Sequence, residues 1–161
     1  ENYTEAVNYA EKSLQNAKID NKVKSDAQII IARSAIKTGN ESKAKDAYAE
    51  VEKIATGALA AEALYYDAYF KNTSSQFEIS NTAVQKLAKD YSGYKLYGAK
   101  GLVLMAKNFY ALGDAFQATY ILESVITNFL DFDDVVKAGN KVFYIAEHRI
   151  NNIDWNSLHC E

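Results

Sequence analysis

Two short segments of the chain carry residue types that could do chemistry. The first is the acidic cluster Asp131–Asp134, whose carboxylates are the type of ligand that calcium takes. A calcium loop of the EF-hand type needs glycine at its sixth position and glutamate at its twelfth, where this sequence has Val136 and Val142. We therefore expect no metal site here, and expect Asp131 or Asp133 to cap the following helix instead.

The second segment is the pair His159 and Cys160, close to the end of the sequence. A nucleophilic thiol needs a base and an orienting group held on a rigid element, whereas this pair lies in an expected tail. The only other histidine is His148. Glycine-rich phosphate loops, nucleophile elbows and zinc-ligand spacings do not occur in the sequence. The sequence therefore predicts a protein that is not an enzyme and needs no cofactor.

The composition is typical of one folded domain. The chain has 161 residues, of which 48% are hydrophobic and 24% charged, enough to form a continuous core. Its net charge of −3 argues against a nucleic-acid partner, because nucleic-acid binders usually carry a basic excess. No apolar run approaches the roughly 20 residues of a transmembrane helix, so we predict no transmembrane segment.

The elements that must position any site are helices. In residues 102–129, apolar residues recur every three to four positions on both sides of the turn Leu112-Gly113-Asp114, the pattern of two amphipathic helices. The chain has no proline, so glycine, asparagine, aspartate and serine must end its helices.

This helical pair has copies along the chain. Small residues of the first helix recur at intervals of 36 and 38, at Ala32, Ala68 and Ala106. Those of the second helix recur at intervals of 38, 36 and 38, at Ala6, Ala44, Ser80 and Ala118. The glycine of the turn is Gly39 in one copy and Gly113 in another, but the middle copy has Ser74-Ser75 there. Such a period predicts an α-solenoid, with an ordinary helical bundle as the alternative.

The pattern resembles the tetratricopeptide repeat (TPR) family over most of the chain. It is carried best by Ala106, Phe109, Leu112, Gly113, Asp114, Ala118, Leu122 and Val125. The family's proline at the end of each repeat is replaced by Thr56, Ser92 and Leu130, and the repeats are longer than the usual 34 residues. We therefore predict an all-α fold, an α-solenoid of antiparallel helix–turn–helix repeats that form a right-handed superhelix. The resemblance implies a non-catalytic scaffold that binds a protein or peptide.

Two short motifs resemble those of one subgroup of the TPR family. Lys89-Asp90-Tyr91 and Phe116-Gln117-Ala118 are similar to bacterial periplasmic and outer-membrane members, which implies the same location here. The sequence begins with a lone second helix and ends near a lone first helix, so we expect a segment of a longer repeat protein or a processed product. We divide this single domain into residues 1–21, 22–57, 58–93, 94–130 and 131–161, the last being a helix and a tail in which Trp155 and Leu158 cover the open end.

The first helices of such a solenoid line its concave groove. Helical geometry places groove residues three before, one after and four after each small residue, and the same register reaches Tyr144 in the last helix. The partner-binding residues that we predict are Arg33, Lys37, Tyr65, Tyr69, Lys100, Lys107, Tyr110 and Lys141.

This basic and aromatic surface suits an extended peptide with carboxylates or a free C-terminus. The alternative interpretation is an ordinary solvated face. The Lys and Asn set of the family's carboxylate clamp is absent, so a chaperone-tail ligand is not implied. A second hypothesis for the function is self-association, in which the open ends or the faces of the solenoid pair to form a homo-oligomer such as a homodimer.

Overall fold

The structure, a computed structural model, describes residues 2–152, and the predictions for Trp155, Leu158, His159 and Cys160 lie outside them. The described residues form eight helices and no strand, which confirms the all-α prediction. The helices are α1 (Tyr3–Leu14), α2 (Asn21–Lys37), α3 (Glu41–Ile54), α4 (Gly57–Thr73), α5 (Phe77–Asp90), α6 (Lys95–Ala111), α7 (Ala115–Asn128) and α8 (Asp133–Asn151).

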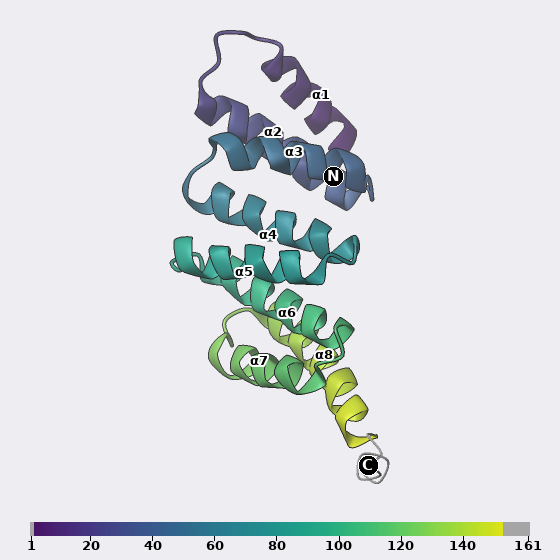
Figure 1. Cartoon of the computed structure of the whole chain (residues 1–161). Coiled ribbons are helices and arrows are strands. Elements are labelled where there is room, and N and C mark those ends of the chain that lie inside the picture. The colour runs from purple at the N-terminus through teal and green to yellow at the C-terminus, as the bar shows by residue number, and fades with distance from the viewer. Residues whose placement is uncertain (1, 153–161) are drawn as a thin grey trace.

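Each helix packs against the next one along the chain, from α1 at the top of Figure 1 to α8 near the bottom. The first helices of successive pairs also touch one another, because α4 packs against α6 and α6 against α8. These three helices therefore share one surface of the molecule. Among the helices of residues 2–152, none combines the length and the apolarity that crossing a lipid bilayer requires.

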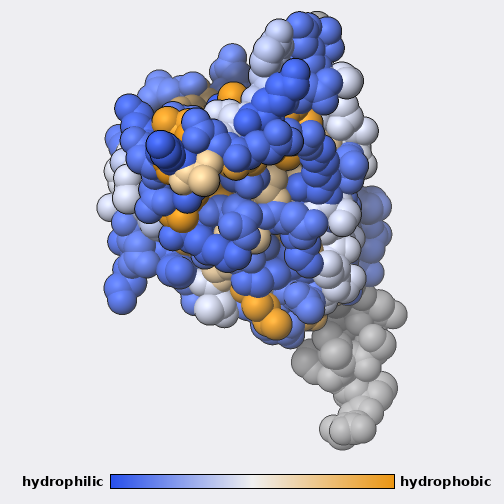
Figure 2. Space-filling model, turned by 90° about the horizontal axis from the view of Figure 1, so that it is seen from above, coloured by the Kyte–Doolittle hydropathy of each residue, from blue (hydrophilic) through white to orange (hydrophobic). Residues whose placement is uncertain are grey.

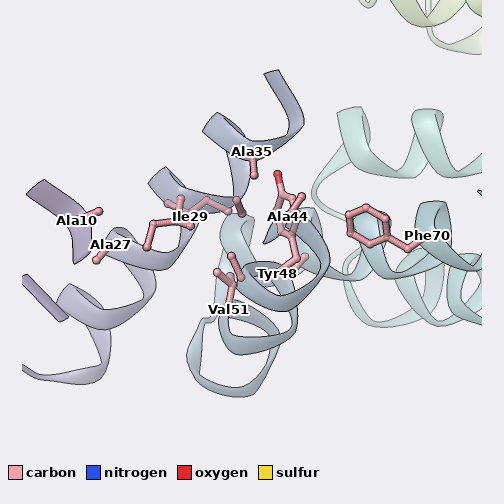
Figure 3. Close-up of a cluster of buried hydrophobic side chains, with 12 residues drawn as sticks. Ala10, Ala27, Ile29, Ala35, Ala44, Tyr48, Val51 and Phe70 are labelled. Carbon is pink, nitrogen blue, oxygen red and sulfur yellow. The ribbon is translucent and has the colours of Figure 1, made fainter. Parts of the chain in front are cut away.

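The small residues that recur in the sequence lie where two helices cross closely. Ala32, Ala68 and Ala106 have no accessible surface. The equivalent residues of the second helices, Ala44, Ser80 and Ala118, have none either. Larger buried side chains fill the space around them at matching positions, namely Tyr48, Val84 and Leu122, and Val51, Leu87 and Val125. Figure 3 shows the first of these clusters, where Ala44, Tyr48 and Val51 of α3 lie among side chains of the neighbouring helices.

The positions of this repeat at the two ends of the stack are less buried than those in the middle. Ala6 is only partly buried, and Tyr144 of α8 is 71% exposed although it follows Ala106 by 38 residues. Both differences have one cause: no helix of residues 2–152 covers that side of α1 or of α8.

The start of α8 corrects one detail of the sequence interpretation. Phe132, not Asp131 or Asp133, occupies the N-cap position, and no side chain there bonds a free backbone N–H. Asp133 and Asp134 lie instead in the first turn, where the positive end of the helix dipole favours carboxylates.

The three turns within helical pairs have the same hydrogen bonds. In the turn after α6, Gly113 N–H donates to Tyr110 O (3.1 Å) and Asp114 N–H donates to Phe109 O (2.9 Å), the two bonds of a Schellman motif. The same pairs of bonds close the turns at Gly39 and Ser75. Gly39 and Gly113 have φ of +73° and +95°, and Ser75 has φ of +58°, so a serine adopts the left-handed conformation in the middle copy.

We expect Ser75→Gly to raise the free energy of unfolding by about 1 kcal/mol, because the left-handed conformation is unfavourable for a residue with a Cβ. Urea denaturation followed by circular dichroism measures the change. The matched control is Ser74→Gly, whose site has φ of −90° and should gain nothing. A lower stability of Ser75→Gly would contradict the expectation.

Candidate functional site

A buried carboxylate connects four helices beside the surface that α4, α6 and α8 share. Glu62 of α4 is 3% exposed. Arg33 of α2 donates to both of its oxygens, from Nε to Oε1 (2.8 Å) and from Nη2 to Oε2 (2.5 Å). The Tyr48 hydroxyl of α3 donates to Oε1 (2.9 Å) and the Tyr97 hydroxyl of α6 donates to Oε2 (2.6 Å). Each oxygen thus accepts two hydrogen bonds, which satisfies the buried charge.

The protonation states of this cluster follow from its geometry. Burial alone would raise the pKa of Glu62, but the hydrogen bonds from Arg33, Tyr97 and Tyr48 outweigh burial and hold it below the ordinary value. Burial, together with the nearby carboxylate, raises the pKa of Tyr48 and of Tyr97. At neutral pH, Glu62 is therefore a charged acceptor and both tyrosines are neutral donors. The cluster connects helices, and its carboxylate has no acceptor position left for a substrate.

Beside this cluster lies a pocket of about 200 Å³ between α4, α6 and α8. Tyrosine rings, aliphatic side chains, an amide, two lysines and one aspartate line it. The residues are Tyr65, Tyr69, Asn72, Lys100, Val103, Leu104, Lys107, Asp134, Val135 and Ala138. Four of the eight predicted groove residues, Tyr65, Tyr69, Lys100 and Lys107, are thus brought together here.

The two lysines of the pocket have no carboxylate partner among residues 2–152. Lys100 Nζ lies 5.8 Å from the ring centroid of Tyr65 and 5.7 Å from that of Tyr97, within the range of cation–π attraction. Neither Lys100 nor Lys107 forms an ion pair within residues 2–152, and Lys107 is exposed. Burial raises the pKa of Tyr65, so its hydroxyl stays neutral. The pocket therefore offers two cations beside aromatic and aliphatic walls.

The other four predicted residues lie elsewhere. Arg33 is bound to Glu62, although 55% of its side chain is exposed. Lys37 lies near the end of α2, at a hollow that Arg33 also lines. The ring of Tyr110 lies 5.1 Å from the guanidinium of Arg149, which also donates to the Tyr110 carbonyl oxygen (3.1 Å). Lys141 is exposed on α8. These residues are not part of the pocket.

Comparison of the chain with protein-family models, with curated proteins and with solved structures gives no match. The site must therefore be interpreted from its own geometry. In the part of the chain that the structure describes, no three His, Cys, Asp or Glu side chains are grouped as holding a metal ion would require.

Sequence reasoning missed a second polar cluster, which holds one wall of the pocket. Asn108 of α6 has no accessible surface, and its Nδ2 donates to Ser80 Oγ (2.9 Å) and to Asn81 Oδ1 (2.7 Å). Its Oδ1 accepts a hydrogen bond from Asn72 Nδ2 (2.6 Å), so the amide of Asn72 is fixed at the pocket. Two signals in the sequence could have indicated these clusters: the amide Asn108 in the largely apolar helix α6, and the carboxylate Glu62 among alanines.

Proposed function

We propose that this protein is a non-catalytic scaffold that binds an extended peptide or protein segment on the face of α4, α6 and α8. The observation that carries the proposal is the pocket in which two tyrosines and two lysines converge from neighbouring first helices, with no ion pair of either lysine in the described part of the chain. We further propose that the helical pairs form an α-solenoid with a right-handed superhelical twist. Buried small residues at intervals of 36 and 38, and the resemblance to the TPR family, support that architecture.

The pocket suggests how such a segment would be held. Tyr65 and Tyr69, with the aliphatic residues opposite them, can bury one apolar side chain of the ligand. Lys100 and Lys107 can bind a carboxylate next to that side chain through charge-assisted hydrogen bonds. The amide of Asn72 can bond the ligand backbone. The ligand is thus expected to combine an apolar anchor with a neighbouring acidic group.

Binding at this pocket is tested with an array of synthetic peptides in which an aromatic or aliphatic residue stands next to Asp, Glu or a free C-terminus. We expect the wild-type chain to bind a subset of them and the double variant Lys107→Glu, Tyr69→Ala to bind none. Reversing one charge repels the ligand carboxylate, and truncating the tyrosine removes an aromatic wall. Fluorescence anisotropy measures binding, and circular dichroism should show unchanged helical content. The melting temperature should fall only modestly, through the lost packing of the Tyr69 ring against Tyr66 and Phe70.

The matched control carries the same two kinds of substitution away from the pocket. Lys89→Glu with Tyr120→Ala changes an exposed lysine of α5 and an exposed tyrosine of α7. This variant should bind as the wild type does. Binding that survives in the Lys107, Tyr69 variant would place the ligand on another surface and refute the proposal.

The location of the protein rests on the family resemblance alone. We propose a bacterial periplasmic or outer-membrane location within a larger repeat protein, as the motifs Lys89-Asp90-Tyr91 and Phe116-Gln117-Ala118 imply. Cell fractionation with an antibody against this segment tests it.

A further inference from the structure

The two lysines of the pocket differ in how their ammonium groups are held. Lys100 is partly buried, and its Nζ contacts the rings of both Tyr65 and Tyr97 at the distances given above. The two rings come from α4 and α6, with centroids 6.1 Å apart and planes tilted by 40°. Lys107 is exposed, and no ring of residues 2–152 lies within cation–π range of its ammonium. Aromatic contacts therefore restrict Lys100 but not Lys107.

The ring of Tyr97 is itself fixed by its hydroxyl. That hydroxyl donates to Glu62 Oε2 (2.6 Å), and Glu62 is held in turn by Arg33 and Tyr48. A hydrogen bond to an ionised acceptor is roughly twice as strong as one between neutral groups. A continuous series of contacts therefore leads from the buried carboxylate through the Tyr97 ring to the ammonium of Lys100.

The repeat indicates which group could pair with Lys100. Lys100 follows Glu62 by 38 residues and occupies the equivalent position in the next unit. Glu62 binds Arg33, and the residue 36 positions after Arg33 is Tyr69. The ion pair of one unit is thus replaced in the next by a lysine and an uncharged ring, both of which line the pocket. A ligand carboxylate would complete there an ion pair that the preceding unit makes within the chain.

The contacts of Lys100 also affect what a bound carboxylate would gain. A ring face attracts an ammonium but is a weak hydrogen-bond acceptor, so the three N–H donors can still bond an anion. Because the ammonium is positioned before the ligand arrives, little side-chain entropy is lost on binding. Lys107 would lose more rotamer freedom in forming such a pair, and its charge acts mainly as long-range attraction.

We propose that Lys100 is the residue that selects a carboxylate at this pocket, and that Tyr97, fixed by Glu62, is its positioning residue. The inference rests on the proposed function, because it concerns the same pocket. The ligand is a segment in which a carboxylate directly adjoins an apolar side chain. Lys107 attracts that ligand without selecting it.

The position of Lys100 is tested first in the free chain. NMR of the full, isotope-labelled protein should show the Hε protons of Lys100 shifted upfield by ring currents, and Tyr97→Phe should reduce that shift because its ring lacks the hydrogen bond to Glu62. The control is Tyr9→Phe on α1, at the end of the stack that Figure 2 views from above, where the surface is mostly hydrophilic. Lys12 Nζ lies 5.8 Å from the exposed ring of Tyr9, and its protons should change little.

The selection of a carboxylate is tested with two probes, N-acetyl-alanyl-phenylalanine and the same peptide with a C-terminal amide. By NMR titration, the wild-type chain should bind the acid about tenfold more tightly than the amide, as one charge-assisted hydrogen bond would give. Lys100→Met should remove this preference, whereas Lys107→Met should weaken the binding of the acid less and retain the preference. Tyr97→Phe should weaken the binding of the acid about threefold and leave that of the amide unchanged.

A double-mutant cycle shows whether Tyr97 acts through Lys100. Tyr97→Phe should have no further effect on the binding of the acid once Lys100→Met is present. Equal effects in both backgrounds overturn the inference, as do unshifted Lys100 protons or a preference that only Lys107→Met removes. A wild-type chain that binds acid and amide equally also overturns it, while the proposed function stands. If neither these probes nor any peptide of the array binds, the proposed function fails and the inference fails with it.

Discussion

Replacing Glu62 with alanine should lower the free energy of unfolding by about 3 kcal/mol, because removing one partner of a buried charge network strands the others. The hydroxyl of Tyr48, which is 2% exposed, would lose its acceptor. Arg33 would lose its partner as well, although its half-exposed side chain can turn to water. Urea denaturation at neutral pH measures the difference. The control is Glu11→Ala, which removes an exposed ion pair with Lys43 and should cost less than about 1 kcal/mol.

The same carboxylate gives the stability a defined pH dependence. The pKa of Glu62 is lower in the folded than in the unfolded chain, so its stabilising effect is present above the unfolded value, about 4.3. The effect is lost as the pH falls through the lower, folded value. The stability difference between wild type and Glu62→Gln should therefore be largest near pH 7 and shrink in acid. A difference that does not change between pH 7 and strong acid would show that the charge of Glu62 does not stabilise the fold.

Replacing Ala106 with leucine should cost roughly 1–3 kcal/mol, since three extra carbon atoms must fit into a closed helix crossing. Ala106 has no accessible surface and lies in one cluster with Ala118 and Leu122. The larger side chain would separate α6 from α7, and the denaturation midpoint should fall while helical content stays near that of wild type. Ala111→Leu is the matched control, because Ala111 is exposed on the same helix. An unchanged midpoint for Ala106→Leu would place this position outside the crossing.

The helices and their closest contacts could be predicted because they repeat. Ala32, Ala68 and Ala106 recur at nearly constant intervals, and only a position with little space holds small residues so regularly. The turn at Gly113 was recognisable for a similar reason, since its φ of +95° favours glycine. Ser75 weakened the signal in the middle copy because there the Schellman hydrogen bonds, not the residue type, maintain the turn.

The candidate site was predictable only in part, because its key contacts join different units. Helical geometry placed Tyr65, Tyr69, Lys100 and Lys107 on one face, and the pocket contains all four. It could not show that Arg33 would bind Glu62, since that contact spans 29 residues and depends on how α2 and α4 approach each other. Residues on one predicted face thus divide into those that are free to bind a ligand and those already used to hold the helices.

The two buried polar clusters also determine which parts of the chain unfold together. Glu62 draws its hydrogen bonds from α2, α3 and α6, and Asn108 bonds residues of α4 and α5. Opening any helix from α2 to α6 would therefore strand a buried polar group, so we expect these five to unfold as one cooperative block. By contrast, α8 is tied to α6 by the exposed bond from Arg149 to the Tyr110 carbonyl and by apolar packing. The pocket thus has two walls in this block and a third on α8, which we expect to open at a lower free energy, so a bound segment should add stability chiefly to that end of the molecule.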